Sequence, residues 1–286
     1  MIKKAGFITL MLVLTFSLAL VGCNSKEPVG NTKEPVGNTK ELTGNIKLAG
    51  STSVQPLAEE LAMKYMEQHK QVKVDVAGGG SGVGIESAVN GSANIGMASR
   101  DLKQAEKDAT PTLKTIVIAQ DGISVVINPR NSVSNLTLAQ IQDIFTGKVT
   151  NWKMVGGNDV NITVVNREEG SGTRGAFEEI VLKGAAYTDK AIIQNSTGAI
   201  KTAVVADVNA IGYISMGSMS ADVKGVQVNG IAPTTDNVVK GTYPISRPFN
   251  FLVKGDPNEV TKSFIDWILA EGGQKIVTDQ GYISIK

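Results

Sequence analysis

Residues 166–177 read NREEGSGTRGAF and follow an apolar run, Ile-Thr-Val-Val, at 162–165. The apolar run predicts a strand, and the small residues at 170–173 predict a turn that leads into a helix. A helix N-terminus offers unpaired N–H groups and the positive end of the helix dipole, and glycine lets a ligand approach the backbone closely. With Arg167 before it and Arg174 after it, such a turn suits an oxyanion. It differs from the nucleotide-binding P-loop, because no Lys-Ser/Thr pair follows its second glycine.

Two earlier segments repeat this strand–turn–helix pattern. A strand at 46–48 runs into Ala-Gly-Ser-Thr-Ser at 49–53, and Pro56 then opens a helix. An alternating strand at 72–76 runs into Gly-Gly-Gly-Ser-Gly at 78–82. In α/β folds such turns gather at the carboxyl edge of the sheet, where ligands bind. We therefore expect one anion cradle to draw on five hydroxyl residues: Thr52, Ser53, Ser81, Ser171 and Thr173.

The rest of the chain continues the alternation of strands and helices that is typical of an α/β fold. The length of 286 residues is enough for about two domains. The pattern predicts strands at 116–118, 123–127, 210–214 and 243–253, and helices at 56–69, 135–147, 198–206 and 260–269.

Composition excludes several classes of function. Lys+Arg 28 against Asp+Glu 27 leaves no excess positive charge for nucleic-acid binding. The single histidine, His69, falls at the polar end of a predicted helix, and no cluster of His, Cys and carboxylates indicates a metal site. An exported hydrolase with Ser81 or Ser171 as nucleophile is disfavoured, because the chain has no G-x-S-x-G elbow and no obvious base beside either serine.

The first residues predict export. Lys3 and Lys4 precede an apolar run at 7–21 that is too short for a typical spanning helix. The run ends in Leu-Val-Gly-Cys, which resembles the bacterial lipobox, and Cys23 is the only cysteine of the chain. We therefore predict a lipoprotein signal peptide at 1–22, a palmitate-type acylation of Cys23, and an extracytoplasmic protein that lipid anchors to the cell membrane. An ordinary signal peptide that happens to contain a cysteine is the alternative.

An internal repeat follows the cysteine. KEPVGNT at 26–32 recurs at 33–39 and then decays into KELTGN at 40–45. Units of seven residues with Pro, Gly and alternating charge cannot bury a core. Residues 23–45 are therefore predicted to be a lipid-anchored linker.

Several motifs occur in an order that resembles a known family. They are AGSTSVQPL at 49–57, GGGSGVG at 78–84, ASRDL at 98–102, NLTLAQIQDIFTGKVTNW at 135–152, REEGSGTRGAF at 167–177, AIGYISM at 210–216 and EGGQKIVTDQGYI at 271–283. This series is similar to that of the substrate-binding proteins of bacterial high-affinity phosphate ABC transporters, and the likeness runs from 46 to 285.

The resemblance implies a type II, periplasmic-binding-protein-like α/β fold with two lobes, two crossover strands and a ligand cleft between the lobes. Lobe I would comprise 46–121 and 247–286, lobe II would comprise 122–246, and the crossovers would lie near 120–124 and 244–249. The implied protein is a monomer without enzyme activity or cofactor. It would bind inorganic phosphate and deliver it to the membrane permease and ATPase subunits of a transporter.

The resemblance also assigns roles within the cleft. Thr52 would offer its hydroxyl, Ser53 mainly its backbone N–H, and Ser81 both. Arg167 would make a bidentate charged contact. Ser171, Gly172 and Thr173 would supply N–H groups and hydroxyls from the other lobe, and Glu169 would orient Arg167.

Two positions and the ligand leave alternatives open. Several family members have Ser-Asp where this chain has Ser-Arg-Asp at 99–101. Either Arg100 contacts the oxyanion, or Asp101 accepts the proton of the ligand, or both occur; a surface Arg–Asp pair at a helix start is the third interpretation. The alternative ligands are sulfate, molybdate and tungstate, and a surface phosphate sensor or adhesin could use the same fold.

Overall fold

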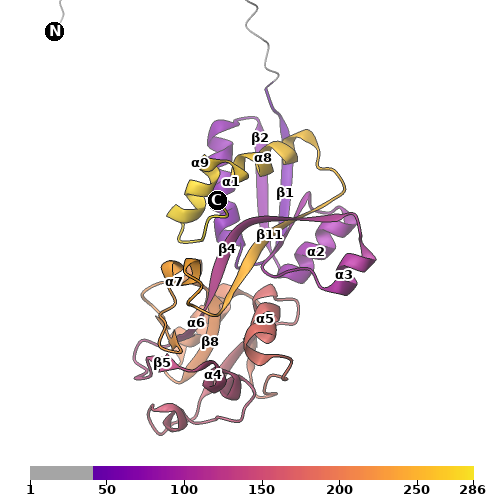
Figure 1. The fold of residues 1–286 in the computed structure, drawn as a ribbon. Coiled ribbons are helices and arrows are strands. Elements are labelled where there is room, and N and C mark those ends of the chain that lie inside the picture. Colours follow the sequence, from indigo (N-terminus) through magenta and orange to yellow (C-terminus); the bar gives the residue numbers. More distant parts are fainter. Residues whose placement is uncertain (1–40) are drawn as a thin grey trace, which may run out of the picture. The chain divides into compact units, whose positions relative to one another are not determined.

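Two antiparallel strands, β4 (Leu113–Ile127) and β11 (Ser246–Lys254), run from one lobe into the other (Figure 1). The computed structural model describes residues 41–286. The predicted signal peptide, Cys23 and most of the predicted linker lie outside the described residues. The first strand, β1 (Gly44–Gly50), begins two residues before the predicted start of the folded part.

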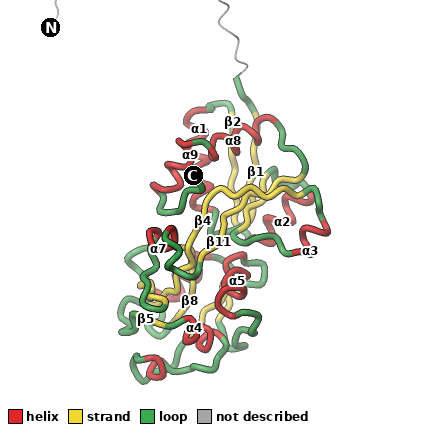
Figure 2. Tube along the Cα trace, viewed as in Figure 1, coloured by secondary structure: helices red, strands yellow, loops and turns green. Residues whose placement is uncertain are grey.

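The strands form one long mixed sheet that passes through both lobes (Figure 2). Its order is β2-β1-β3-β11-β4-β8-β6-β7, and the short strand β9 also pairs with β4. The remaining bounds are β2 (Val72–Gly78), β3 (Ile95–Ala98), β6 (Thr163–Arg167), β7 (Ile192–Gln194), β8 (Ala210–Ser215) and β9 (Lys224–Gly225). A separate pair joins β5 (Asn135–Leu136) to β10 (Gln227–Val228).

Strand β4 changes partner along its length. Its first part, up to Gly122, pairs with β11, and its last part, from Ile123, pairs with β8. The sequence predicted two strands separated by residues 120–122, and this prediction is wrong. Residues 120–122 stay in the ladder because they pair with Ser246, Arg247 and Pro248 of β11, where their backbone groups find hydrogen-bond partners in the extended conformation.

Lobe I packs helices around the strands β1 to β3. The helix α1 (Gln55–Gln68) buries one face and contributes Leu57 and Tyr65 to a core that also contains Phe249 and Phe264. The other helices of this lobe are α2 (Ser81–Asn90), α3 (Gln104–Ala109), α8 (Glu259–Leu269) and α9 (Glu271–Asp279).

Lobe II has its own core, in which Phe145, Trp152, Phe177 and Tyr213 are buried. Its helices are α4 (Leu138–Phe145), η1 (Trp152–Val155), α5 (Gly172–Phe177), η2 (Glu178–Leu182), α6 (Thr197–Ala206), η3 (Met216–Ser218) and α7 (Thr235–Val239). The helix α4 begins three residues later than predicted, because its first two predicted residues pair with β10 and Thr137 forms a capping box instead. Within residues 41–286, no helix combines the length and the apolar character that a membrane crossing requires.

Candidate functional site

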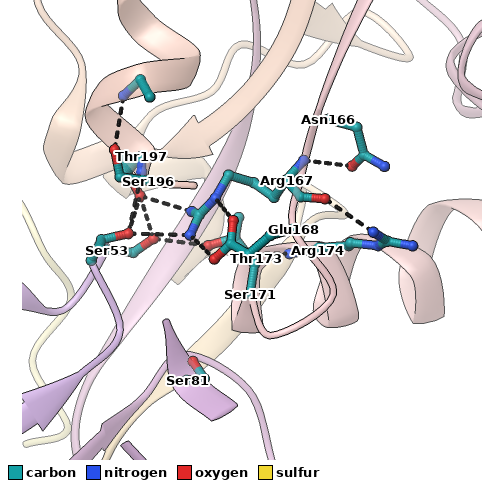
Figure 3. A network of polar contacts seen from close by, with 12 residues as sticks. Ser53, Ser81, Asn166, Arg167, Glu168, Ser171, Thr173, Arg174, Ser196 and Thr197 are labelled. Atoms are coloured by element: carbon teal, nitrogen blue, oxygen red, sulfur yellow. Dashed lines mark hydrogen bonds and ion pairs between the residues drawn. The ribbon is translucent and has the colours of Figure 1, made fainter. Parts of the chain in front are cut away.

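Hydroxyl groups from the two lobes meet at the seam between them (Figure 3). Ser53 lies in the turn between β1 and α1, and Thr173 and Thr197 lie in the first turns of α5 and α6. The hydroxyl oxygen of Ser53 is 2.8 Å from that of Thr173 and 2.8 Å from that of Thr197. The hydroxyl cluster, as we call Thr52, Ser53, Thr173 and Thr197, is therefore shared by both lobes.

Arg167, at the end of β6, is the charged member of this site. Its side chain is only 2% exposed. Its Nη1 donates to the Thr197 hydroxyl and its Nη2 to the Thr52 hydroxyl, both at 3.3 Å. The amide of Thr197 also donates to the Thr52 hydroxyl, at 3.2 Å. Since a hydroxyl oxygen has two lone pairs, the Thr52 proton is left to donate, either to the Thr197 hydroxyl 3.4 Å away or to an oxyanion.

Glu168, not the predicted Glu169, holds Arg167 in place. The Arg167 Nε and Nη2 atoms each donate to one carboxylate oxygen of Glu168 at 2.8 Å, a bidentate pair. The Glu168 amide donates to the carbonyl of Gln194 on β7, so the residue stays beside the strand and its carboxylate reaches the guanidinium. Glu169 follows in the turn, and its side chain is exposed. The prediction of Glu169 as orienting residue is therefore corrected.

The glycine-rich turns before α2 and α5 touch directly. Gly80 has a positive φ of 88° and precedes Ser81, whose buried hydroxyl accepts from the Ser99 amide at 3.0 Å. A Cβ atom on Gly172 would collide with the hydroxyls of Ser81 and Ser99. Across the same seam, the Gly82 amide donates to the Gly170 carbonyl at 2.9 Å.

The start of α5 supplies further donors. Ser171 is the N-cap, and its hydroxyl accepts from the Arg174 amide at 3.2 Å. Gly172 and Thr173 are the first residues of the helix, so the helix itself does not use their amides. Arg174 turns away from the hydroxyl cluster and donates to Glu178 at 2.8 Å and to the Arg167 carbonyl at 3.1 Å.

Arg100 and Asp101 do not join the hydroxyl cluster. The guanidinium of Arg100 donates to both carboxylate oxygens of Glu106 in α3, at 2.7 and 2.8 Å, and Asp101 is exposed. Burial opposes ionisation of Glu106, but hydrogen bonds from Arg100 and the Lys103 amide outweigh it, and the pKa of this carboxyl is lowered. The expected contacts of Arg100 and Asp101 with the ligand stay predictions that this geometry does not favour, because the Glu106 carboxylate pairs with the arginine and Asp101 is exposed.

A second buried arginine borders the cluster. Arg247 on β11 pairs with Asp121 on β4 at 3.0 Å, with side chains 2% and 1% exposed. The Nη1 of Arg247 donates to the Ser99 carbonyl at 2.8 Å and to the Thr173 hydroxyl at 3.0 Å. Burial raises the pKa of Asp121, against the opposing charge of Arg247, and lowers the pKa of Arg247.

The site holds donors for an anion rather than ligands for a cation. In the part of the chain that the structure describes, no group of three or more His, Cys, Asp or Glu side chains is arranged to hold a metal ion.

Comparison with known proteins assigns the family. A sequence model for the PBP superfamily domain matches residues 35–271. The phosphate-binding protein PstS of Bacillus subtilis (strain 168) is 31% identical over 286 residues, which cover 99% of this chain and 95% of that protein. The chain belongs to the PstS family.

Solved structures of proteins that are named for phosphate transport share the fold. A phosphate ABC transporter substrate-binding protein from Clostridium perfringens, described with bound phosphate, is 45% identical and superposes with a TM-score of 0.82. The match covers 85% of this chain and 100% of that chain. An ABC-type phosphate transport receptor from Vibrio cholerae is 41% identical with a TM-score of 0.70 and covers 84% and 100% of the two chains. The predicted two-lobed, type II α/β fold is confirmed.

In this PstS-family chain, sequence reasoning missed five polar residues of the site: Ser99, Asp121, Glu168, Thr197 and Arg247. Thr197 carried a usable signal, because Ser-Thr-Gly at 196–198 follows a strand and opens a helix, as the other turns do. Asp121 and Arg247 carried none, since both lie inside strands and meet only through the register of β4 and β11.

Proposed function

We propose that this protein is an extracytoplasmic solute-binding protein that captures inorganic phosphate between its lobes for import by an ABC transporter. The observation that carries the proposal is the buried guanidinium of Arg167, which donates to hydroxyls of both lobes at the hydroxyl cluster. A tetrahedral oxyanion has acceptor oxygens in several directions, and a shell of donors from two lobes can surround it.

The directions of the hydrogen bonds support an anionic ligand. Arginine only donates, so the hydroxyls that accept from Arg167 keep their own protons for another acceptor. Hydrogen bonds to an ionised acceptor are also the strong ones. The similar protein from Bacillus subtilis is a phosphate-binding protein and that from Clostridium perfringens is described with bound phosphate, which favours phosphate among the tetrahedral oxyanions.

The proposed contacts come from both lobes. Arg167 would supply the charge, and the first residues of α2 and α5 would supply amides and hydroxyls. Thr197 joins the residues that the sequence suggested. The proposed set of donors is Thr52, Ser53, Ser81, Arg167, Ser171, Gly172, Thr173 and Thr197.

A binding measurement on the dialysed protein tests the proposal. Isothermal titration with phosphate should give a single site, and native mass spectrometry of the purified protein should show one retained phosphate. Sulfate and molybdate, titrated in the same buffer, serve as the competing oxyanions. If phosphate binds no more tightly than both of them, the ligand assignment is wrong.

The cellular setting is part of the same proposal. The lobes would be divided as the sequence predicted, with 46–121 and 247–286 in lobe I and 122–246 in lobe II. Acylated Cys23 and the repeat at 23–45 would anchor the monomer at the cell membrane, where a permease and an ATPase complete the transporter. The protein would release phosphate unchanged and would therefore not be an enzyme.

A further inference from the structure

The buried pair of Arg247 and Asp121 lies where the two crossover strands face each other. The residues are register partners on β11 and β4, and their side chains are among the least exposed of the described residues. The second oxygen of Asp121 accepts from the Ser215 hydroxyl at 2.9 Å. Removing two charges from water is expensive, and such a pair is weak evidence for a purely stabilising role.

The other edge of Arg247 points to the proposed ligand site. Its Nη1 donates to the Thr173 hydroxyl at 3.0 Å, and Thr173 is one of the proposed phosphate contacts. Because a guanidinium cannot accept a hydrogen bond, the Thr173 oxygen must be the acceptor in this contact. The Thr173 proton is therefore free to donate to a different group. The Ser53 hydroxyl, in lobe I, lies 2.8 Å away on that side.

Arg167 imposes the same direction of hydrogen bonding from the opposite end of the hydroxyl cluster. Arg167 donates to Thr197, and Thr197 lies 2.8 Å from the same Ser53 oxygen. Two buried guanidinium groups thus end a chain of three hydroxyls. If both threonines direct their protons inward, the Ser53 oxygen accepts twice and its own proton is left over for an outside acceptor. Hydrogen bonds in such a chain strengthen one another.

We propose that Arg247 is a positioning residue of the oxyanion site: it directs the Thr173 proton to the Ser53 hydroxyl, so that the Ser53 proton is left for the ligand, and it is itself held by Asp121 on the other crossover strand. This inference rests on the proposed function. It gives the crossover strands a direct link to the ligand contacts, in addition to their role as connections. A brace that merely joins β4 to β11 would not need the contact with Thr173.

A double-mutant cycle on phosphate affinity separates the two roles. Arg247→Met alone would leave the Asp121 charge buried without its partner, so the cycle is built on Asp121→Asn, whose amide oxygen can still accept from the Arg247 guanidinium. All four proteins of the cycle carry Asp121→Asn. One has no further change, one adds Arg247→Met, one adds Thr173→Val, and one adds both substitutions. Arg247→Met should weaken phosphate binding by about 10-fold or more when Thr173 is present. When valine replaces Thr173, the loss of affinity caused by Arg247→Met should be smaller by a factor of at least about 5.

Equal losses in the two backgrounds would overturn the inference, since a brace acts without regard to the Thr173 hydroxyl. Thermal unfolding without phosphate shows that each variant is folded. If the Arg247→Met variants do not fold, the guanidinium 15N resonances of Arg247 carry the test. They should shift on phosphate addition in the wild type and not in Thr173→Val, and equal shifts in both would overturn the inference. A wild type that binds no phosphate would overturn the proposed function as well, whereas a phosphate-binding wild type with equal losses overturns only the role of Arg247.

Discussion

The amide of Gly82 in α2 donates a hydrogen bond of 2.9 Å to the carbonyl of Gly170, so the backbones of the two lobes are joined directly. No side chain separates the lobes at this contact. One turn further, Gly172 lies against Ser81 and Ser99. The approach of the lobes therefore depends on the absence of a side chain at Gly172.

Gly172→Ala should hinder closure and weaken phosphate binding. The added Cβ would collide with the Ser81 and Ser99 hydroxyls. Overpacking of this kind costs about 1–3 kcal/mol, which corresponds to about 5- to 150-fold in affinity. Titration calorimetry measures the loss, and small-angle scattering at saturating phosphate should give a larger radius of gyration than in the wild type. Gly170→Ala is the matched control, because its Cβ would meet nothing within 4 Å. Equal affinities of the two variants would contradict this account.

Arg167→Ala should abolish tight phosphate binding in a folded protein. The variant removes the buried guanidinium that donates to Thr52 and Thr197. Truncation of one partner of a buried, hydrogen-bonded charge pair costs about 2–5 kcal/mol. Titration calorimetry measures the affinity, and Arg130→Ala, at an exposed arginine, serves as control. An unchanged affinity in folded Arg167→Ala would exclude this residue from the site.

Glu168→Gln should reduce the preference for phosphate over sulfate. The Glu168 carboxylate pairs with Arg167 and reaches the lobe I turn, where its Oε1 is 3.1 Å from the position of a Cβ on Gly80. Phosphate near neutral pH keeps a proton that it can donate to this carboxylate, whereas sulfate can only accept and would meet a like charge. A hydrogen bond to a charged group is worth about 1.5–3 kcal/mol, so we expect the affinity ratio to fall by about 10-fold or more.

Asp101→Asn is the matched control for this selectivity, since the Asp101 side chain is exposed. Competition titrations on the wild type and both variants give the three ratios. A ratio that changes in Asp101→Asn and stays constant in Glu168→Gln would restore the original assignment of Asp101 as the acceptor.

Glu106→Gln should lower the melting temperature at neutral pH but not in acid. The pKa of Glu106 is lowered in the folded protein despite burial, through Arg100 and the Lys103 amide. Its ionised form therefore adds stability above the ordinary glutamate pKa of about 4.3, and this stability is lost as the pH falls further. The Arg100–Glu106 pair is partly buried, and since exposed pairs contribute about 0.2–1 kcal/mol, we expect a loss near the upper end of this range, or about 2–4 °C. Thermal melts from pH 7 to pH 3 should converge, and Glu67→Gln, at an exposed ion pair, is the control. A constant difference across this range would refute the assignment.

Cys23→Ser should release the protein from the membrane without changing phosphate affinity. The predicted acylation site lies outside the described residues and before the first strand of the folded part. Cell fractionation and titration of the released protein measure the two properties, and Ser25→Ala serves as processing control. If the Cys23→Ser protein stays at the membrane, the anchor is a different segment.

Local patterns predicted the parts of the site that lie on strand–turn–helix connections. Thr52, Ser53 and Thr173 follow from such connections, and the structure brings their hydroxyls into one cluster with Arg167. A strand end followed by small residues leaves a helix N-terminus at the sheet edge, so the sequence determines both the element and its place.

The remaining parts depend on pairings between distant segments. Asp121 and Arg247 are 126 positions apart and meet because two strands adopt one register. Whether Glu168 or Glu169 pairs with Arg167 depends on the conformation of the turn that follows β6. Arg100 pairs with Glu106 in α3, a partner that no spacing rule predicts. The sequence of a strand shows which of its residues alternate between the two faces of the sheet. It does not show which strand pairs with it or in which register, because the assembled sheet determines both.

Every arginine described around the site has a carboxylate beside it: Arg100 has Glu106, Arg167 has Glu168, Arg174 has Glu178 and Arg247 has Asp121. Each pair is nearly neutral when seen from a distance, so together they exert little long-range pull on an approaching anion. Capture then depends on random encounter followed by local recognition. Salt screens charges that are more than about 10 Å apart at 0.1 M, but here there is little long-range attraction for it to weaken. A protein built this way would scavenge its ligand at nearly the same speed in dilute and in salty surroundings.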